Sequence, residues 1–147
     1  MSANRSEFAG CNCLAIRQAA RHITQFYDHC LAPAGLRATQ YAIISWLRTG
    51  PMSINALAAE LVMDRTTLGR NILPLQRDGL IEVAPGRADR RRHELRLTDA
   101  GLARQRSAAV HWVAAQKRFT EVFGAERSTA LRGLLHEVVA AEFTDPE

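Results

Sequence analysis

The feature that most constrains the fold is a pair of short helical patterns with almost no sequence between them. Ser53 precedes the first pattern and Asp64 the second, and both are common N-caps because their side-chain oxygens accept bonds from the first helical turn. Apolar residues recur at helical spacing in both, at Ile54, Leu57, Ala58 and Leu61 and then at Leu68, Ile72 and Leu75. We therefore expect two helices joined by a tight turn. The second should cover residues 64–77, and Pro74 should bend it near Arg70 without ending it.

The second helix should present a polar face away from its apolar stripe. That face contains Thr66, Thr67, Arg70 and Asn71, and Arg65 lies at its start. Hydroxyl, guanidinium and carboxamide groups can bind phosphates and the edges of bases in a DNA groove.

An arginine-rich hairpin is expected directly after this helix. Residues 80–83 and 94–97 alternate apolar and polar side chains, as short half-buried strands do. The loop between them contains Arg87, Arg90, Arg91 and Arg92, with Asp89 as its main acid. Arginines so close together repel each other unless an anion lies beside them, so a phosphate or a narrow minor groove explains them better than a solvated turn. Together these elements predict a winged helix-turn-helix.

Several segments resemble the MarR family of dimeric, winged-helix DNA-binding regulators. The matching segments are Met63–Leu68, Asn71–Leu75, Gly79–Ile81 and Asp89–Arg91, followed by Leu97, Thr98 and Gly101. The resemblance extends over roughly residues 10–143. It implies that the helix over 64–77 lies in the major groove and that the wing enters the minor groove. It also implies that Asp89 pairs with Arg91 and aims that arginine at DNA.

Composition is consistent with one folded domain that binds a polyanion. The chain has 147 residues, a hydrophobic content of 47% and a net charge of +4. A local excess of arginine over acid between residues 64 and 96 accounts for most of that charge. This basic segment does not by itself separate nucleic acid from acidic protein, so a protein-binding adaptor without DNA specificity stays an alternative. No apolar run is long enough for a membrane span, and three cysteines make no disulfide framework, so we expect a cytoplasmic protein.

The other helical patterns surround the winged core. They cover residues 11–31, 39–47, 98–122 and 126–143. We expect a mainly α fold (α+β): a single domain over 1–147 with a winged core at 39–98. Helices within 11–31 and 98–143 would form a homodimer. Such a dimer would bind a near-palindromic double-stranded operator, and the resemblance favours repression.

The resemblance also implies a pocket for a small aromatic or phenolic effector. Helix faces alone suggest Ile16, Arg17, Ala20, Ile44, Trp46 and His111 as lining residues. For each of them taken alone, an ordinary core or surface role is the commoner interpretation.

Other chemistries have weaker support. Cys11 and Cys13 suggest an alternative regulator that is switched by oxidation, although small apolar packing is the commoner role of cysteine. His22 and His29 lack the tight spacing of a metal site, so no metal or cofactor is expected. Cys13 and His22 would lie roughly 13 Å apart along one helix, beyond hydrogen-bond reach, so the sequence predicts no enzyme.

Overall fold

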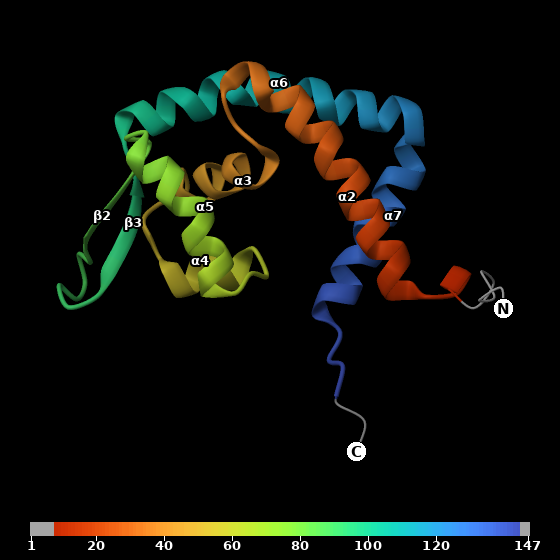
Figure 1. Cartoon of the computed structure of the whole chain (residues 1–147), viewed down its shortest axis with the longest axis horizontal. Helices are drawn as coiled ribbons and strands as arrows, with labels where there is room; N and C mark the ends of the chain where they lie inside the picture. The colour runs from red at the N-terminus through yellow and green to blue at the C-terminus, as the bar shows by residue number, and fades with distance from the viewer. Residues whose placement is uncertain (1–7, 145–147) are drawn as a thin grey trace, which may run out of the picture. The chain divides into compact units, whose positions relative to one another are not determined.

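The structure is a computed structural model that describes residues 8–144 (Figure 1). Its helices are α2 (Asn12–Leu31), the 3₁₀ turn η1 (Ala32–Ala34), α3 (Ala38–Leu47), α4 (Ile54–Glu60), α5 (Arg65–Arg77), α6 (Asp99–Phe123) and α7 (Ala125–Ala140). Its strands are β1 (Met52–Ser53), β2 (Ile81–Pro85) and β3 (His93–Leu97). The chain forms two compact units, and the boundary between them in the sequence falls within α6. The first ends at Trp112 and the second begins at Val113.

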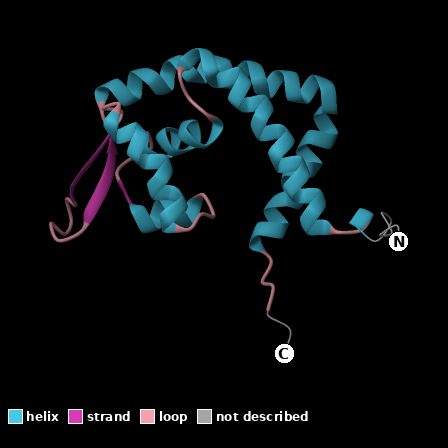
Figure 2. Ribbon diagram, viewed as in Figure 1, coloured by secondary structure: helices cyan, strands magenta, loops and turns pink. Residues whose placement is uncertain are grey.

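The strands form one small antiparallel sheet in the order β1-β3-β2 (Figure 2). Ile81 pairs with Leu97 at one end of the β2–β3 hairpin, and Pro85 pairs with His93 near its loop. The predicted strand pair is confirmed. β1 was not predicted, because two residues are too few to show alternation, and it pairs with β3 through Met52 and Leu95.

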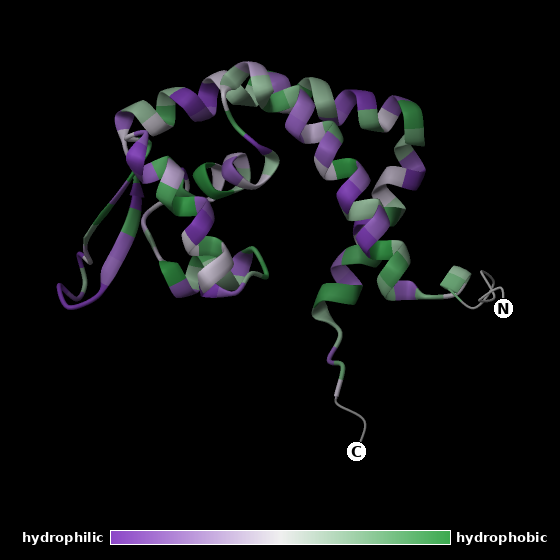
Figure 3. Cartoon of the chain, in the orientation of Figure 1, coloured by the Kyte–Doolittle hydropathy of each residue, from purple (hydrophilic) through white to green (hydrophobic). Residues whose placement is uncertain are grey.

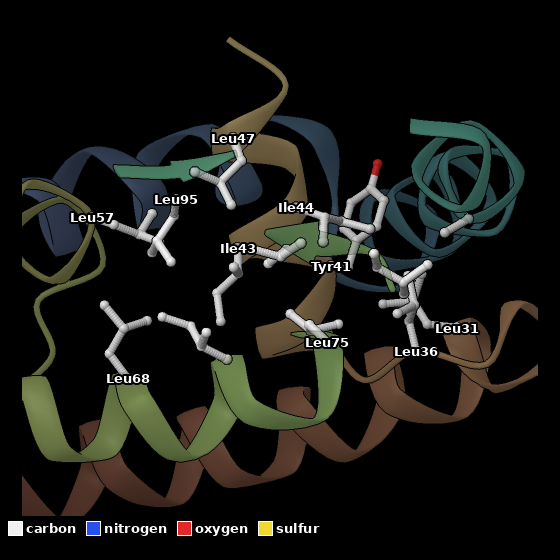
Figure 4. Close-up of a cluster of buried hydrophobic side chains, with 14 of the residues drawn as sticks. Leu31, Leu36, Tyr41, Ile43, Ile44, Leu47, Leu57, Leu68, Leu75 and Leu95 are labelled. Atoms are coloured by element: carbon white, nitrogen blue, oxygen red, sulfur yellow. The ribbon is translucent and has the colours of Figure 1, made fainter. Parts of the chain in front are cut away.

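The core of the first unit joins α2, α3, α4, α5 and the sheet (Figure 4). Both predicted apolar stripes are confirmed: Leu57, Ala58, Leu68, Ile72 and Leu75 are buried, and Ile54 and Leu61 pack against them. α3 is the most apolar helix and buries four of its ten residues. This packing fixes α5 against the rest of the unit through one face and leaves its other face exposed.

The N-cap predicted at Ser53 is confirmed, and so is the continuation of the second helix past Pro74. The Ser53 hydroxyl accepts a hydrogen bond from the Ala56 backbone N–H at 3.1 Å, and α5 continues through Pro74 to Arg77. Val62, in the turn before Asp64, adopts a left-handed backbone with φ of 51°, which β-branched residues rarely do. An unpredicted cap joins α2 to α3, where the Asp28 carboxylate accepts the Ala38 N–H at 2.7 Å.

The second unit comprises the end of α6 and α7. Within it the Arg127 guanidinium lies 4.3 Å from the centre of the Phe123 ring. α7 ends at Ala140 and not at Phe143 as predicted, because Ala141 is extended and no glycine or proline near that point marks the end in the sequence. Of its described residues only Ala115 and Ser128 are buried. Exposed apolar side chains therefore remain, although no described helix is long and apolar enough to cross a membrane.

Candidate DNA interface and effector cavity

The start of α5 is held by an aspartate and a threonine. Asp64 Oδ1 accepts the Thr67 backbone N–H at 2.8 Å, and Asp64 Oδ2 accepts the Thr67 hydroxyl at 2.6 Å. The Thr67 side-chain hydrogen bond, followed by the Thr67 backbone bond, lowers the pKa of the Asp64 carboxyl below its usual value. The carboxylate is therefore ionised at neutral pH and suits the positive end of the helix.

These hydrogen bonds decide which groups of α5 remain available to DNA. The Thr67 hydroxyl donates to Asp64, so it can only accept from a further partner. Asn71 Nδ2 donates to the Thr67 carbonyl at 2.9 Å, which holds the carboxamide along the helix. Arg65, Thr66 and Arg70 are exposed, and their side chains form no hydrogen bond or ion pair with other described residues.

One residue of this face was missed by the sequence reasoning. Arg77 is exposed in the last turn of α5, seven residues after Arg70 and therefore on the same side of the helix. It pairs weakly with Asp78 at 3.8 Å, and both side chains are exposed. Its position at i+7 from a predicted contact was the signal that could have identified it.

The wing loop is closed by its own backbone. Gly86 N–H donates to the Arg92 carbonyl at 2.6 Å, and Arg92 N–H donates to the Asp89 carbonyl at 3.1 Å. A Cβ on Gly86 would lie 2.7 Å from the Asp89 carbonyl oxygen, so only glycine fits this turn without movement.

The implied side-chain pair of Asp89 and Arg91 is not what the structure shows. Asp89 Oδ1 accepts the backbone N–H of Arg91 at 3.0 Å, a bond that closes an Asx turn. This bond turns the other carboxylate oxygen toward Arg92, whose Nε lies 3.9 Å away. Asp89 therefore shapes the loop and contacts Arg92, and the Arg91 guanidinium is not held by it.

Three of the four wing arginines are consequently available to an anion. Arg87, Arg90 and Arg91 are exposed, and no carboxylate in the described part of the chain pairs with them. Figure 3 shows the loop between β2 and β3 as a hydrophilic tip. The exposed face of α5 and this tip belong to the same compact unit. The fold and the site thus define a winged helix-turn-helix protein.

A cavity of about 520 Å³ opens beside α3 in the first unit. Its wall is largely aromatic, from Tyr27, Tyr41, Trp46 and Trp112, and the rings of Tyr41 and Trp112 are stacked with centroids 6.1 Å apart. Ser45 and Gln105 also line it, and their Oγ and Oε1 atoms are buried without a hydrogen-bond partner in the structure. An aromatic wall with a few unsatisfied polar atoms is typical of a small-molecule site.

Only one of the six residues suggested for the pocket lines this cavity. That residue is Trp46. Ile44 is fully buried in the core, whereas Ile16, Arg17 and Ala20 are exposed on the first half of α2. His111 is half-buried, but its neighbour Trp112 provides the wall. Most of the other residues that line this cavity lie on the same three helices, α2, α3 and α6.

The two N-terminal cysteines lie at the start of α2. Cys11 is its N-cap, and its Sγ accepts the Leu14 backbone N–H at 3.4 Å. Cys13 is exposed in the first turn, and all three cysteines are free thiols.

Comparison with known proteins agrees with this architecture. The sequence model of the MarR family matches residues 34–92. The transcriptional regulator MosR of M. tuberculosis, solved in complex with DNA, is 36% identical over 87% of this chain and 97% of its own, with a TM-score of 0.72. The transcriptional repressor CouR, bound to a 23-mer duplex, is 25% identical over 94% and 99%, with a TM-score of 0.81. PcaV of Streptomyces coelicolor, with its natural ligand, shares the fold at 22% identity over 91% and 95%, with a TM-score of 0.79.

No curated protein sequence matches the chain. The chain belongs to the MarR family and is a DNA-binding transcriptional regulator.

Proposed function

We propose that the protein is a homodimeric repressor that reads a near-palindromic operator with α5 in the major groove and the wing in the minor groove. The observation that carries this proposal is the unpaired state of Arg87, Arg90 and Arg91 beside an exposed polar face of α5. Arg65, Thr66, Thr67, Arg70, Asn71, Asp89 and Arg92 complete the proposed contact set. The proposal assigns no catalytic role and no cofactor, and operator binding would place the protein in the cytoplasm.

The second unit supports dimerisation. Val113, Val122, Leu134 and Val139 each expose more than half of their surface, and an apolar surface of this kind is expected to bind a partner. We take a second copy as that partner, with residues 11–31 and 98–143 as dimerisation helices around the winged core at 39–98. Two copies would place their recognition helices about 34 Å apart, in successive major grooves.

Fluorescence anisotropy with duplex DNA tests the DNA contacts. Arg70→Ala is expected to weaken operator binding by about 1–3 kcal/mol if the guanidinium reads a base edge. The loss should be smaller on random duplex. The matched variant Arg37→Ala, an exposed arginine before α3 and outside the proposed dimerisation helices, should bind normally. Equal losses on both duplexes would make Arg70 a backbone contact. An adaptor for acidic proteins would show no preference for duplex at either low or high salt.

We further propose that the aromatic cavity binds a small aromatic or phenolic effector that releases the protein from DNA. CouR has been solved with p-coumaroyl-CoA and PcaV with its natural ligand. In this chain a ring would lie against Tyr41 and Trp112, and a hydroxyl would donate to Gln105 Oε1.

Gln105→Leu tests this placement because it removes the unpaired acceptor and keeps the side-chain volume. The variant should keep its affinity for DNA and lose release by phenolic compounds, because the effector's hydroxyl no longer has a partner. Anisotropy of a labelled duplex during titration with p-coumarate and salicylate measures this release. Wild-type-like release in the variant would place the effector elsewhere.

Oxidation of Cys11 and Cys13 is a second candidate switch. The two thiols are separated by one residue, Asn12, and Cys11 already accepts a helix N-cap hydrogen bond. A peroxide would convert one thiolate into a sulfenic acid and release its own reduced oxygen as water or alcohol. The other thiol would then displace water to form a disulfide.

The variant Cys11→Ser/Cys13→Ser should bind DNA normally and no longer respond to peroxide. Thiol counting and anisotropy before and after peroxide measure both effects, and Cys30→Ser is the matched control. A peroxide response that survives in the double variant would exclude this switch.

A further inference from the structure

A second cavity, of about 260 Å³, lies at the base of the wing. It is formed by the end of α3, the wing and the start of α6. Its charged wall consists of Arg48, Arg87, Arg96 and Asp99. Arg48 and Arg96 do not belong to the proposed DNA contact set, and Arg48 also lies at the edge shared with the lining of the aromatic cavity. The DNA contacts therefore do not explain this cluster.

The charge of this cavity is not balanced by its neighbours. Arg96 is partly engaged, because its Nη2 donates to the Pro85 carbonyl at 3.1 Å and lies 3.7 Å from a Glu94 carboxylate oxygen. Its Nε is buried and has no acceptor in the structure. No ion pair or hydrogen bond of the Arg48 or Arg87 guanidinium occurs within residues 8–144. Asp99 is the one acid that lines the cavity with them.

The start of α6 adds to the positive potential of the cavity. α6 is 25 residues long and begins at Asp99, so the positive end of its dipole lies in the cavity wall. Thr98 caps this helix start, because its hydroxyl accepts the Gly101 N–H and donates to the Gly79 carbonyl. The cap satisfies one N–H of the first turn and adds no negative charge.

We propose that Arg48, Arg87 and Arg96 form a binding site for one phosphate group. Guanidinium groups pair with phosphate through two parallel N–H bonds, and a tetrahedral anion can be bound by three such groups at once. A volume of about 260 Å³ holds such an anion with several waters, each of which occupies roughly 30 Å³ in the liquid. The phosphate comes either from a free small molecule or from the backbone of bound DNA.

The first experiment examines free phosphate with the full-length protein and no DNA. The line width of the ³¹P resonance of inorganic phosphate should increase when wild-type protein is added, because bound phosphate tumbles slowly. The matched variant Arg106→Gln, which lies in none of the described cavities, should broaden it equally. Arg48→Gln should remove most of the broadening, and Arg48→Lys should retain part of it because the charge remains.

The second experiment examines DNA with the same variants. If a backbone phosphate occupies the site, Arg48→Gln should reduce the slope of log K against log salt by about 0.9, the contribution of one phosphate contact. Arg96→Gln provides a second variant, and thermal unfolding by circular dichroism shows that each variant is folded.

If Arg48→Gln removes the broadening of the ³¹P resonance, the site binds free phosphate. If Arg48→Gln reduces the slope of log K against log salt, the site binds a phosphate of the DNA backbone. Wild-type behaviour of both folded variants in both experiments would overturn the proposal. Because the first experiment contains no DNA, failure of the proposed operator binding would leave its result intact.

Discussion

The combined variant Arg87→Gln/Arg90→Gln/Arg91→Gln is expected to weaken duplex binding at least about a hundredfold. These three guanidiniums are the wing groups without a carboxylate partner, so each is available for a charged hydrogen bond worth on the order of 1.5 kcal/mol. The slope of log K against log salt should also fall by roughly 2.7, or about 0.9 for each lost phosphate contact. Anisotropy over a salt series measures both quantities.

A second combined variant controls for the change in net charge. Arg106→Gln/Arg118→Gln/Arg132→Gln removes the same charge from exposed positions on α6 and α7, outside the winged core. Because these helices are the proposed dimerisation helices, gel filtration first shows that the variant is still a dimer. A dimeric variant should keep the wild-type salt slope. If both variants lose affinity equally, the wing makes no specific contact and the effect is one of overall charge.

Gly101→Ala is expected to destabilise the fold by about 3 kcal/mol, near the upper end of the usual range for overpacking. A Cβ at this position would lie 2.0 Å from the Leu80 carbonyl oxygen and 2.6 Å from Leu97 Cδ1. The carbonyl belongs to the backbone, so the start of α6 must move. That movement would also disturb Thr98, which joins Gly79 to the first turn of α6.

Gly69→Ala is the matched control, because no atom lies within 4 Å of a Cβ at that position in α5. Alanine there should be neutral or stabilise the protein by about 0.5–1 kcal/mol. Urea unfolding of both variants gives the comparison. Similar stabilities for Gly101→Ala and the wild type would show that α6 does not pack against Leu80 as described.

The parts of the fold that depend on local chemistry were predictable from the sequence. Ser53 and Asp64 were identified as caps because capping needs only a side-chain oxygen and the next three residues. The buried stripe of α5 followed from its spacing. β1 was not predictable, since its two residues form a strand only because β3 lies beside them.

The residue types of the site were predictable from the sequence, but the hydrogen bonds and ion pairs between them were less so. The wing arginines were evident from the sequence, whereas the contact of Asp89 with Arg92 depends on the conformation of the loop backbone. The effector cavity shows the same limit. Trp46 was identified from α3, but Gln105 lies on α6 and lines the same cavity only in the folded unit. Helical periodicity identifies the apolar face of a helix but does not identify the element that packs against that face.

Hydroxyl-radical footprinting of an operator duplex shows whether a dimer binds through α5 and the wing. We expect two protected segments on one face of the duplex, about 34 Å apart, each flanked by protection in the adjacent minor groove. The combined variant Arg87→Gln/Arg90→Gln/Arg91→Gln should lose the flanking protection first. A single protected segment, or uniform protection along the duplex, would contradict a dimer that binds through α5 and the wing.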